Sequence, residues 1–351
     1  MFNIFKKIIF FFIFLFVLTV SNVCFASQIL NVYTWSNYIP SDVYHEFERK
    51  TGIHVNISEY DSNETMYAKL KADPEIGFDV IIPSSYYVQR MIREKMLQPL
   101  DKSKLPNIKF LMPTLLNKQF DPNNQYSLPY FWGVTGIVVN DNYYHPNDVT
   151  TWEDFWQKKY KNQLLLLNDV REVFAIALIT LGYPPNDTNP EHIKQAYLKL
   201  EKLLPNIKLF NSDAATNVYI DEDAAIGMGW NGDVYLATLE NPHIKFIYPK
   251  NHFMLWIDCM AIPKNAPHLN NAYRFMNFLM QPDIAERISM EQGYPPPNWK
   301  AMQMLPENMR ENPIFNPPQQ ALERADVMLD IGSAIDVYEN YWEKLKLGGN
   351  G

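Results

Sequence analysis

The segment Ser127–Asn140, with the sequence SLPYFWGVTGIVVN, sets the architecture of the chain. Its second part, Thr135 to Asn140, is an apolar run of strand length, and a second apolar run, Cys259 to Pro263, follows Trp256-Ile257-Asp258. Each run has a proline or a glycine beside it. We interpret the two as strands that cross between two lobes, so that the chain leaves the first lobe, builds the second and returns.

Short apolar runs alternate with helical patterns on both sides of this segment. Before it, Ile29 to Tyr33 is typical of a strand, and Ser41 and Gly52 are suited to begin and end a helix. After it, Leu164 to Leu167 reads as a buried strand and Asp169 to Leu181 as a helix. Such alternation favours mostly parallel sheets with helices on both faces. We therefore predict an α/β fold.

The first 26 residues have the pattern of a cleaved signal peptide. Lys6 and Lys7 precede an apolar run of 13 residues from Ile8 to Val20, and small residues stand three and one before Ser27. An uncleaved membrane anchor is the alternative, but 13 residues fall short of the roughly 20 that a bilayer span needs. We expect cleavage after Ala26 and export from the cytoplasm.

The cysteine content indicates that the exported chain relies on its hydrophobic core. Cleavage after Ala26 would remove Cys24, so that Cys259 has no partner for an intrachain disulfide. A lipid on Cys24 is an alternative, disfavoured because residues 21–23 lack the small side chains of such a site. Cys259 lies in an apolar stretch, where we expect a buried thiol. The 325 residues left of 351 are enough to build a core without disulfides.

The net charge excludes one class of partner and leaves two interpretations. The formal charge of the chain is −8, and it becomes −10 when two lysines leave with the signal peptide. Nucleic-acid-binding proteins are basic on at least one face, so we predict no nucleic acid partner. An acidic surplus fits either solubility or a cationic ligand.

Sequence motifs for catalysis are missing. There is no Gly-x-Ser-x-Gly, no Walker-type loop and no Gly-x-Gly-x-x-Gly, to which Gly227-Met228-Gly229 is the nearest approach. The seven histidines never adopt the spacing of metal ligands, and the one cysteine left after cleavage of the signal peptide makes no cluster. A triad built from distant residues stays open. We predict no enzyme activity, no metal and no cofactor.

Aromatic residues stand beside acids or small polar residues where predicted strands end. In open α/β sheets the ligand crevice lies outside the carboxyl ends of the strands. Aromatic faces attract ammonium groups, and carboxylates accept charge-assisted hydrogen bonds, so together they suit a flexible organic cation. Taken singly, each tryptophan could also be a core residue. The segments are Trp35-Ser36-Asn37-Tyr38, Ser84-Ser85-Tyr86-Tyr87, Asp169-Val170-Arg171-Glu172, Trp230-Asn231-Gly232-Asp233 and Trp256-Ile257-Asp258.

Three acids in these segments are the candidates for binding amines. Asp169 and Glu172 are three residues apart at a helix start, so they lie on one face and can address one amine together. The same spacing is also a capping box, and the helix dipole would keep both carboxylates ionised. Asp258 lies in an otherwise apolar strand with no basic residue within five positions. Because a buried carboxylate is unfavourable unless it is paired, we expect a ligand cation beside Asp258.

At these residues the sequence closely resembles the periplasmic spermidine/putrescine-binding proteins of bacterial ABC importers. The likeness runs from about Leu30 to Lys346, essentially the whole chain after the signal peptide. The segments that carry it are Tyr60–Leu70 (YDSNETMYAKL), Pro83–Val88 (PSSYYV), Asp121–Asn124 (DPNN), Asp169–Phe174 (DVREVF), Phe210–Asp213 (FNSD) and Gly293–Pro295 (GYP).

The resemblance implies a type II periplasmic binding protein, with two mostly parallel sheets joined by crossing strands and the ligand in the interlobe cleft. We assign residues 27–134 with 258–303 to the N-terminal lobe and 135–257 with 304–348 to the C-terminal lobe. The resemblance further implies a periplasmic monomer that delivers a polyamine to an inner-membrane ABC permease and does no chemistry. A periplasmic polyamine sensor for a membrane signalling protein is the alternative, and a hydrolase is a third possibility.

The family's polyamine site can be carried over position by position. In the family, Asp169 and Glu172 would hold one terminal amine and Asp258 an inner amine, with aromatic rings along the methylenes. The candidate ligand-binding residues are Trp35, Ser36, Asn37, Tyr38, Ser84, Tyr86, Asp169, Glu172, Ser212, Trp230, Trp256, Asp258 and Tyr294.

Two positions depart from the spermidine-preferring pattern of the family. An acid stands between Ser36 and Tyr38 in that pattern, whereas Asn37 carries no charge. Where the pattern has a glutamine near the C-terminus, this chain has Met328. Both positions face the ligand end far from Asp169. We therefore hypothesise a weaker hold on a third amine, so that putrescine or another polyamine competes with spermidine.

Overall fold

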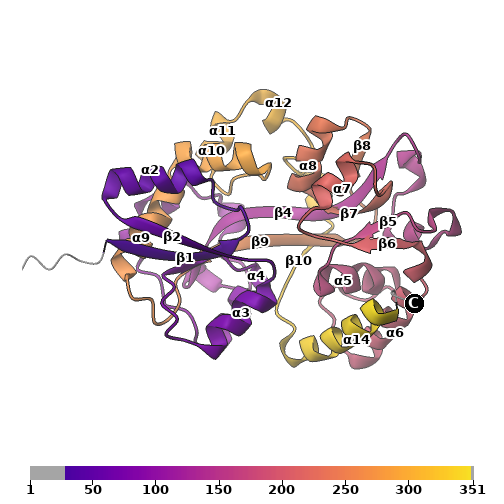
Figure 1. The fold of residues 1–351 in the computed structure, drawn as a ribbon, viewed down its shortest axis with the longest axis horizontal. Coiled ribbons are helices and arrows are strands. Elements are labelled where there is room, and N and C mark those ends of the chain that lie inside the picture. Colours follow the sequence, from indigo (N-terminus) through magenta and orange to yellow (C-terminus); the bar gives the residue numbers. More distant parts are fainter. Residues whose placement is uncertain (1–27, 349–351) are drawn as a thin grey trace, which may run out of the picture.

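The computed structural model describes residues 28–348, so the signal peptide expected over residues 1–26 lies outside the described residues. Figure 1 shows two α/β halves side by side, with strands β4 (Ser127–Asn140) and β9 (Phe253–Ala261) at the centre. Helices cover both faces of the strands, as the alternating pattern predicts. Within the described range, no helix combines the length and the apolar character that crossing a membrane would require.

Strands and helices alternate along most of the described chain. The other strands are β1 (Ile29–Trp35), β2 (His54–Tyr60), β3 (Val80–Ile81), β5 (Leu164–Leu166), β6 (Ile207–Phe210), β7 (Ile226–Trp230), β8 (Ile244–Ile247) and β10 (Ala325–Val327). The helices are α2 (Ser41–Thr51), α3 (Asn63–Ala72), α4 (Ser85–Arg93), α5 (Val170–Thr180), α6 (Pro190–Glu201), α7 (Ala215–Ile220), α8 (Asn231–Glu240), α9 (Leu269–Leu279), α10 (Pro282–Gln292), α11 (Trp299–Met304), α12 (Glu307–Arg310), α13 (Gln319–Leu322) and α14 (Ile335–Gly348).

The strands form one continuous hydrogen-bonded series rather than two separate sheets. Its order is β2-β1-β3-β9-β4-β7-β5-β6, with β10 also paired to β9 and β8 to β4. Pairing is parallel within β2-β1-β3 and within β7-β5-β6, and it is antiparallel wherever β4 takes part. The two parallel units expected from the sequence are therefore the two ends of a single sheet.

Strand β4 changes partner halfway along its length. Residues 127–134 pair with β9, whereas residues 135–139 pair with β7 and residues 137–140 with β8. All fourteen residues of β4 are buried. One strand thus belongs to both halves. The lobe boundaries assigned from the sequence stay predictions.

Gly227 serves close packing and not a phosphate loop. It lies in β7, where a Cβ atom would come within 2.1 Å of the Leu165 carbonyl oxygen in β5 and within 2.5 Å of the Tyr219 hydroxyl in α7. That hydroxyl donates a hydrogen bond of 2.7 Å to the Met228 carbonyl oxygen. Two strands and a helix can therefore meet here only because residue 227 has no side chain.

Replacing Gly227 with alanine should destabilise the protein. The added methyl group must displace backbone, and overpacking of this kind lowers the free energy of unfolding by about 1–3 kcal/mol. Urea unfolding followed by circular dichroism measures the change. As a control, Gly348→Ala should leave the midpoint unchanged or slightly raised, because the nearest atom to its Cβ is 3.7 Å away. Equal midpoints for the two variants would contradict this account.

Candidate ligand-binding site

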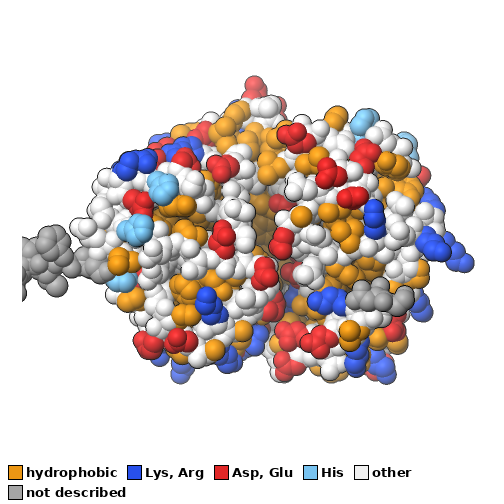
Figure 2. Space-filling view, viewed as in Figure 1, with side chains coloured by type: hydrophobic (Ala, Val, Ile, Leu, Met, Phe, Trp, Pro, Cys, Tyr) orange, Lys and Arg blue, Asp and Glu red, His pale blue; other side chains and the backbone are white. Residues whose placement is uncertain are grey.

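A cavity of about 370 Å³ lies between the two halves, a volume in the range of small-molecule sites. Figure 2 shows its mouth as a groove with hydrophobic atoms inside and acidic side chains on both sides. The thirteen candidate residues from the sequence all line this cavity, as does Met328. The fold thus brings together residues as distant in sequence as Trp35 and Tyr294, and their contact with a ligand stays a prediction.

Asp258 lies on β9 and is 6% exposed. Its carboxylate accepts hydrogen bonds from the Tyr38 hydroxyl, at 2.5 Å, and from the Ser84 hydroxyl, at 2.6 Å. Neither partner carries a positive charge. Burial raises the pKa of Asp258 to about 6, although both hydroxyl donors act to lower it. The expectation of an acid that lacks a basic neighbour is therefore met in the fold as well as in the sequence.

Asp169 caps helix α5, while Glu172 faces the cavity. One oxygen of Asp169 accepts from the backbone N–H groups of Arg171 and Glu172, at 2.8 and 3.0 Å. Oε1 of Glu172 accepts from the Thr135 hydroxyl at 2.8 Å and from Trp230 Nε1 at 3.4 Å, and Oε2 is buried without a hydrogen-bond partner. The capping interpretation therefore holds for Asp169 alone.

Burial dominates the electrostatics of this pair. It raises the pKa of Asp169, against the opposing effects of backbone N–H groups and of Arg171. Burial, and then the charge of Asp169, raise the pKa of Glu172 to about 8. Two carboxylates that repel each other, one with an unpartnered buried oxygen, form a place where an ammonium group would be stabilised.

Asp233 is a further carboxylate in the cavity wall with a raised pKa, and the sequence-based prediction missed it. It lies in the first turn of α8, where Tyr294 donates a hydrogen bond of 2.7 Å to its Oδ1. Burial raises the pKa of Asp233 to about 6. Burial, and then the charges of Asp233 and Asp258, raise the pKa of Tyr294, so this hydroxyl lies near two acids. The signal was available, because Asp233 follows the carboxyl end of a predicted strand.

The loop at Asn37 is held by its backbone. Asn37 has a φ of 56°, in the left-handed region that asparagine tolerates better than most residues. Its N–H donates to Glu59 at 2.7 Å, and its carbonyl oxygen accepts from Gln292 at 2.9 Å. Gln292 is two residues before Tyr294, so Asn37 lies on the same side of the cavity as Asp233.

Aromatic side chains form the remaining walls of the cavity. Trp256 and Tyr294 meet edge to face with ring centres 5.2 Å apart, and Trp35 packs on Tyr60 at 4.9 Å. Trp35 is further fixed by a hydrogen bond of 3.1 Å to the Ile82 carbonyl oxygen. These rings give an apolar surface that suits methylene groups.

Other residues in the wall were not selected from the sequence, although most stand in the segments that carry the family resemblance. Asn63, for example, donates to the Ser84 hydroxyl at 3.1 Å and to the Tyr86 hydroxyl at 3.0 Å, and so orients both. Across residues 28–348, no three His, Cys, Asp or Glu side chains are grouped to hold a metal ion. The additional lining residues are Tyr60, Asp61, Asn63, Asp213, Asp233 and Gln292.

Comparison with known proteins connects this cavity to a family. Residues 42–317 match the family described as bacterial extracellular solute-binding protein. The chain belongs to this family. It is 43% identical over 319 residues to the spermidine/putrescine-binding periplasmic protein of Salmonella typhimurium, covering 91% of this chain and 92% of that protein. It is 34% identical over 343 residues to the putrescine-binding periplasmic protein PotF of Escherichia coli, covering 91% of each.

A solved structure extends the comparison to three dimensions. The spermidine/putrescine ABC transporter substrate-binding protein PotD from Streptococcus pneumoniae superposes with a TM-score of 0.79 at 34% identity, covering 92% of this chain and 100% of that one. The resemblance inferred from the sequence is confirmed.

Low pH should favour the enclosed, ligand-free form of the cavity. Carboxyl groups with raised pKa values bind protons more tightly when enclosed than when open to water, where carboxyl pKa values are about 4. The stabilisation is complete below about pH 4. It is lost as the pH rises through about 6, for Asp233 and Asp258, and about 8, for Glu172.

Small-angle X-ray scattering of the ligand-free protein at pH 5 and pH 8.5 measures this effect. We expect a larger radius of gyration at pH 8.5. Glu172→Gln should reduce the difference, whereas Glu240→Gln, at an exposed position on α8, should preserve it. A radius that is independent of pH in the unmodified protein would contradict the assignment.

Proposed function

We propose that this chain binds polyamines between its two halves and delivers them to an inner-membrane ABC permease. One observation carries the proposal: besides the exposed Asp61 and Asp213, four carboxylates whose pKa values are raised by burial line an aromatic cavity. Their hydrogen-bond donors are neutral, and the charge of Arg171 offsets burial only at Asp169 and Glu172. Bringing them together without a cation is unfavourable, and a ligand with several ammonium groups removes the penalty.

The four carboxylates form two groups that suit the two ends of a diamine. Asp169 and Glu172 begin α5, and Asp233 and Asp258 both lie near Tyr294. Ammonium groups would bind at each group, and the methylenes between them would lie against the tryptophan rings. The third amine of a triamine would instead meet Asn37, which offers an amide and no charge.

The relatives support the cellular setting. Proteins 43% and 34% identical to this chain are named as periplasmic and polyamine-binding, and a similar structure is a substrate-binding protein of an ABC transporter. We infer export to the periplasm, a monomer, and no chemistry on the ligand. Ligand binding would shift the population from an open to a closed form. Loss of polyamine uptake on deletion of the gene, with signalling responses intact, would separate transport from sensing.

Asp258→Asn should weaken polyamine binding about 100-fold, because removing one partner of a buried charge pair costs about 3 kcal/mol. The amide oxygen can accept from one of the two hydroxyl groups and the amide N–H can donate to the other, so the fold should persist. Isothermal titration calorimetry with putrescine measures the affinity, and circular dichroism checks the fold. Asp283→Asn, on the exposed side of α10, is the control and should bind as the unmodified protein does. Unchanged affinity in the Asp258 variant would sink the site assignment.

Putrescine should bind within about tenfold of spermidine, because both ends of a diamine find carboxylates and only the third amine meets Asn37. Titrations with putrescine, spermidine and norspermidine give the ranking. Asn37→Glu should shift the preference toward spermidine. Asn37→Gln should not, because it has the same backbone strain as the Asn37→Glu variant but carries no charge. A strong preference of the unmodified protein for spermidine would refute this ranking while leaving the proposed function intact.

A further inference from the structure

Arg171 is a buried arginine whose role the proposed function leaves open. It is 1% exposed, lies one residue before Glu172 in α5 and does not line the cavity. Its guanidinium donates to the Leu329 carbonyl oxygen at 3.1 Å and to Asn186 Oδ1 at 2.9 Å, and its Nε is buried without a partner. None of these partners is charged. A buried cation held by neutral groups alone is unfavourable, so its charge requires an explanation.

The nearest explanation is the carboxylate pair at the start of the same helix. The charge of Arg171 acts to lower the pKa of both Asp169 and Glu172, against the effect of burial. Both acids line the cavity, whereas Arg171 lies behind it. The arginine therefore supplies positive charge to the acids from the protein side, and a bound ammonium group would supply it from the ligand side.

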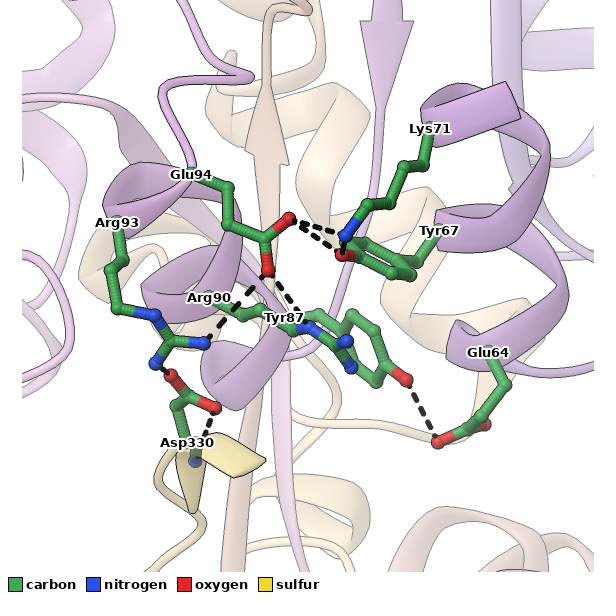
Figure 3. Close-up of polar contacts among 9 residues, drawn as sticks. Glu64, Tyr67, Lys71, Tyr87, Arg90, Arg93, Glu94 and Asp330 are labelled. Carbon is green, nitrogen blue, oxygen red and sulfur yellow. Dashed lines mark hydrogen bonds and ion pairs between the residues drawn. The ribbon is translucent and has the colours of Figure 1, made fainter. Parts of the chain in front are cut away.

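The surroundings add negative charge and so increase the need for this cation. Glu64 in α3 faces Asp169, and burial together with that charge raises the pKa of Glu64 to about 7. Glu64 accepts a hydrogen bond of 3.1 Å from Tyr87, as Figure 3 shows. The charge of Glu339 in α14 also raises the pKa of Glu64. The charge of Arg90 in α4 acts to lower the pKa of Glu339, against the effect of burial.

Arg171 is also joined to a segment that passes between the halves, residues 327–330. Asn186 accepts from Arg171, accepts from the Leu329 N–H at 3.0 Å and donates to the Val327 carbonyl oxygen at 2.9 Å. In Figure 1 the chain after β10 runs between the halves toward α14. The second half thus holds this segment through one arginine and one asparagine.

Helix α4 of the first half holds the same segment from the other side. Ser85, Gln89 and Arg93 are spaced four residues apart and therefore share one face of the helix. Ser85 donates to the Met328 carbonyl oxygen at 2.9 Å, and Gln89 accepts from the Asp330 N–H at 2.9 Å. Arg93 forms an ion pair with the Asp330 carboxylate, which is visible in Figure 3.

Arg171 reaches the first half directly as well. Its guanidinium carbon lies 5.3 Å from the centre of the Tyr86 ring, within the range of a cation–π contact. Tyr86 belongs to α4 and lines the cavity. One side chain therefore contacts the 327–330 segment and the opposite wall, and its charge acts on both acids.

We propose that Arg171 is a positioning residue for ligand binding, which keeps Asp169 and Glu172 available to an ammonium group and ties them to the 327–330 segment. This inference rests on the proposed function. The charge of Arg171 and the hydrogen bonds of Arg171 make separate contributions to ligand binding, and two substitutions can distinguish them. Arg171→Gln removes the charge and keeps a donor for Leu329 or Asn186, and Arg171→Lys keeps the charge and loses the two-pronged contact.

The test is the pH profile of putrescine affinity, measured by calorimetry at pH 6.5, 7.5 and 8.5. Without the charge of Arg171 the acids hold their protons to higher pH, and each unit of pKa changes the ionised population about tenfold. For Arg171→Gln we expect about tenfold weaker binding at pH 6.5 than in the unmodified protein, with much of the loss recovered at pH 8.5. Arg171→Lys should give a profile parallel to that of the unmodified protein.

Arg93→Gln is the matched control, because it removes one of the three contacts between α4 and the 327–330 segment and leaves the charge at Arg171. Its profile should also be parallel to that of the unmodified protein. Equal weakening of the glutamine and lysine variants at every pH would reduce Arg171 to a structural brace and overturn the proposal. If the glutamine variant does not fold, the lysine variant decides the question alone. A pH profile of putrescine affinity that is displaced to higher pH in Arg171→Lys would overturn the role of the charge. If the unmodified protein binds no polyamine at any pH, the proposed function fails instead.

Discussion

Negative charge enclosed in a shared cavity is the constraint on which this structure depends. Asp258 and Asp233 are bound by hydroxyl groups, and Glu172 keeps one buried oxygen without a partner. Neutral donors lower the penalty of burying a carboxylate but do not remove it. The raised pKa values of Glu172, Asp233 and Asp258 reflect the part of this penalty that remains. The enclosed form is thus incomplete by itself, and a multiply charged organic cation is the chemical species that completes it.

The fold presents these charges from both halves of one sheet. Parallel strands within each half direct their carboxyl ends toward the cavity, which places Trp35 and Trp230 at its wall. Strand β9 contributes Asp258 from the connection between the halves, opposite Phe131 of β4. Because β4 is buried along its whole length and hydrogen-bonded first to β9 and then to β7 and β8, the connection is a structured part of the core and not a loose linker.

The sequence predicts most of the candidate site because strand ends converge in this class of fold. Trp35 and Asp169 each follow an apolar run, and Asp258 stands out within one, so local patterns reveal them. The single sheet could not be predicted, since the change of partner along β4 depends on pairing with distant strands. Asp233 was visible beside Trp230, but only its contact with Tyr294 shows that it faces the cavity. In the sequence Arg171 likewise resembles an ordinary helical residue, and only the structure shows its hydrogen bonds to Leu329 and Asn186.

The hydrogen bonds to Asp258 have a consequence for how length is recognised. Its two donors, Tyr38 and Ser84, both come from the first half, whereas Asp169 and Glu172 come from the second. Under the proposed shift from an open to a closed form, a cation would dock at Asp258 while the halves are apart, and Asp169 and Glu172 would reach the ligand only as the halves close. If the halves close by a fixed amount, the gap between the two anionic groups is fixed too. The protein would then select ligands by the distance between their two positive charges, which must match the distance between the two anionic groups of the closed form.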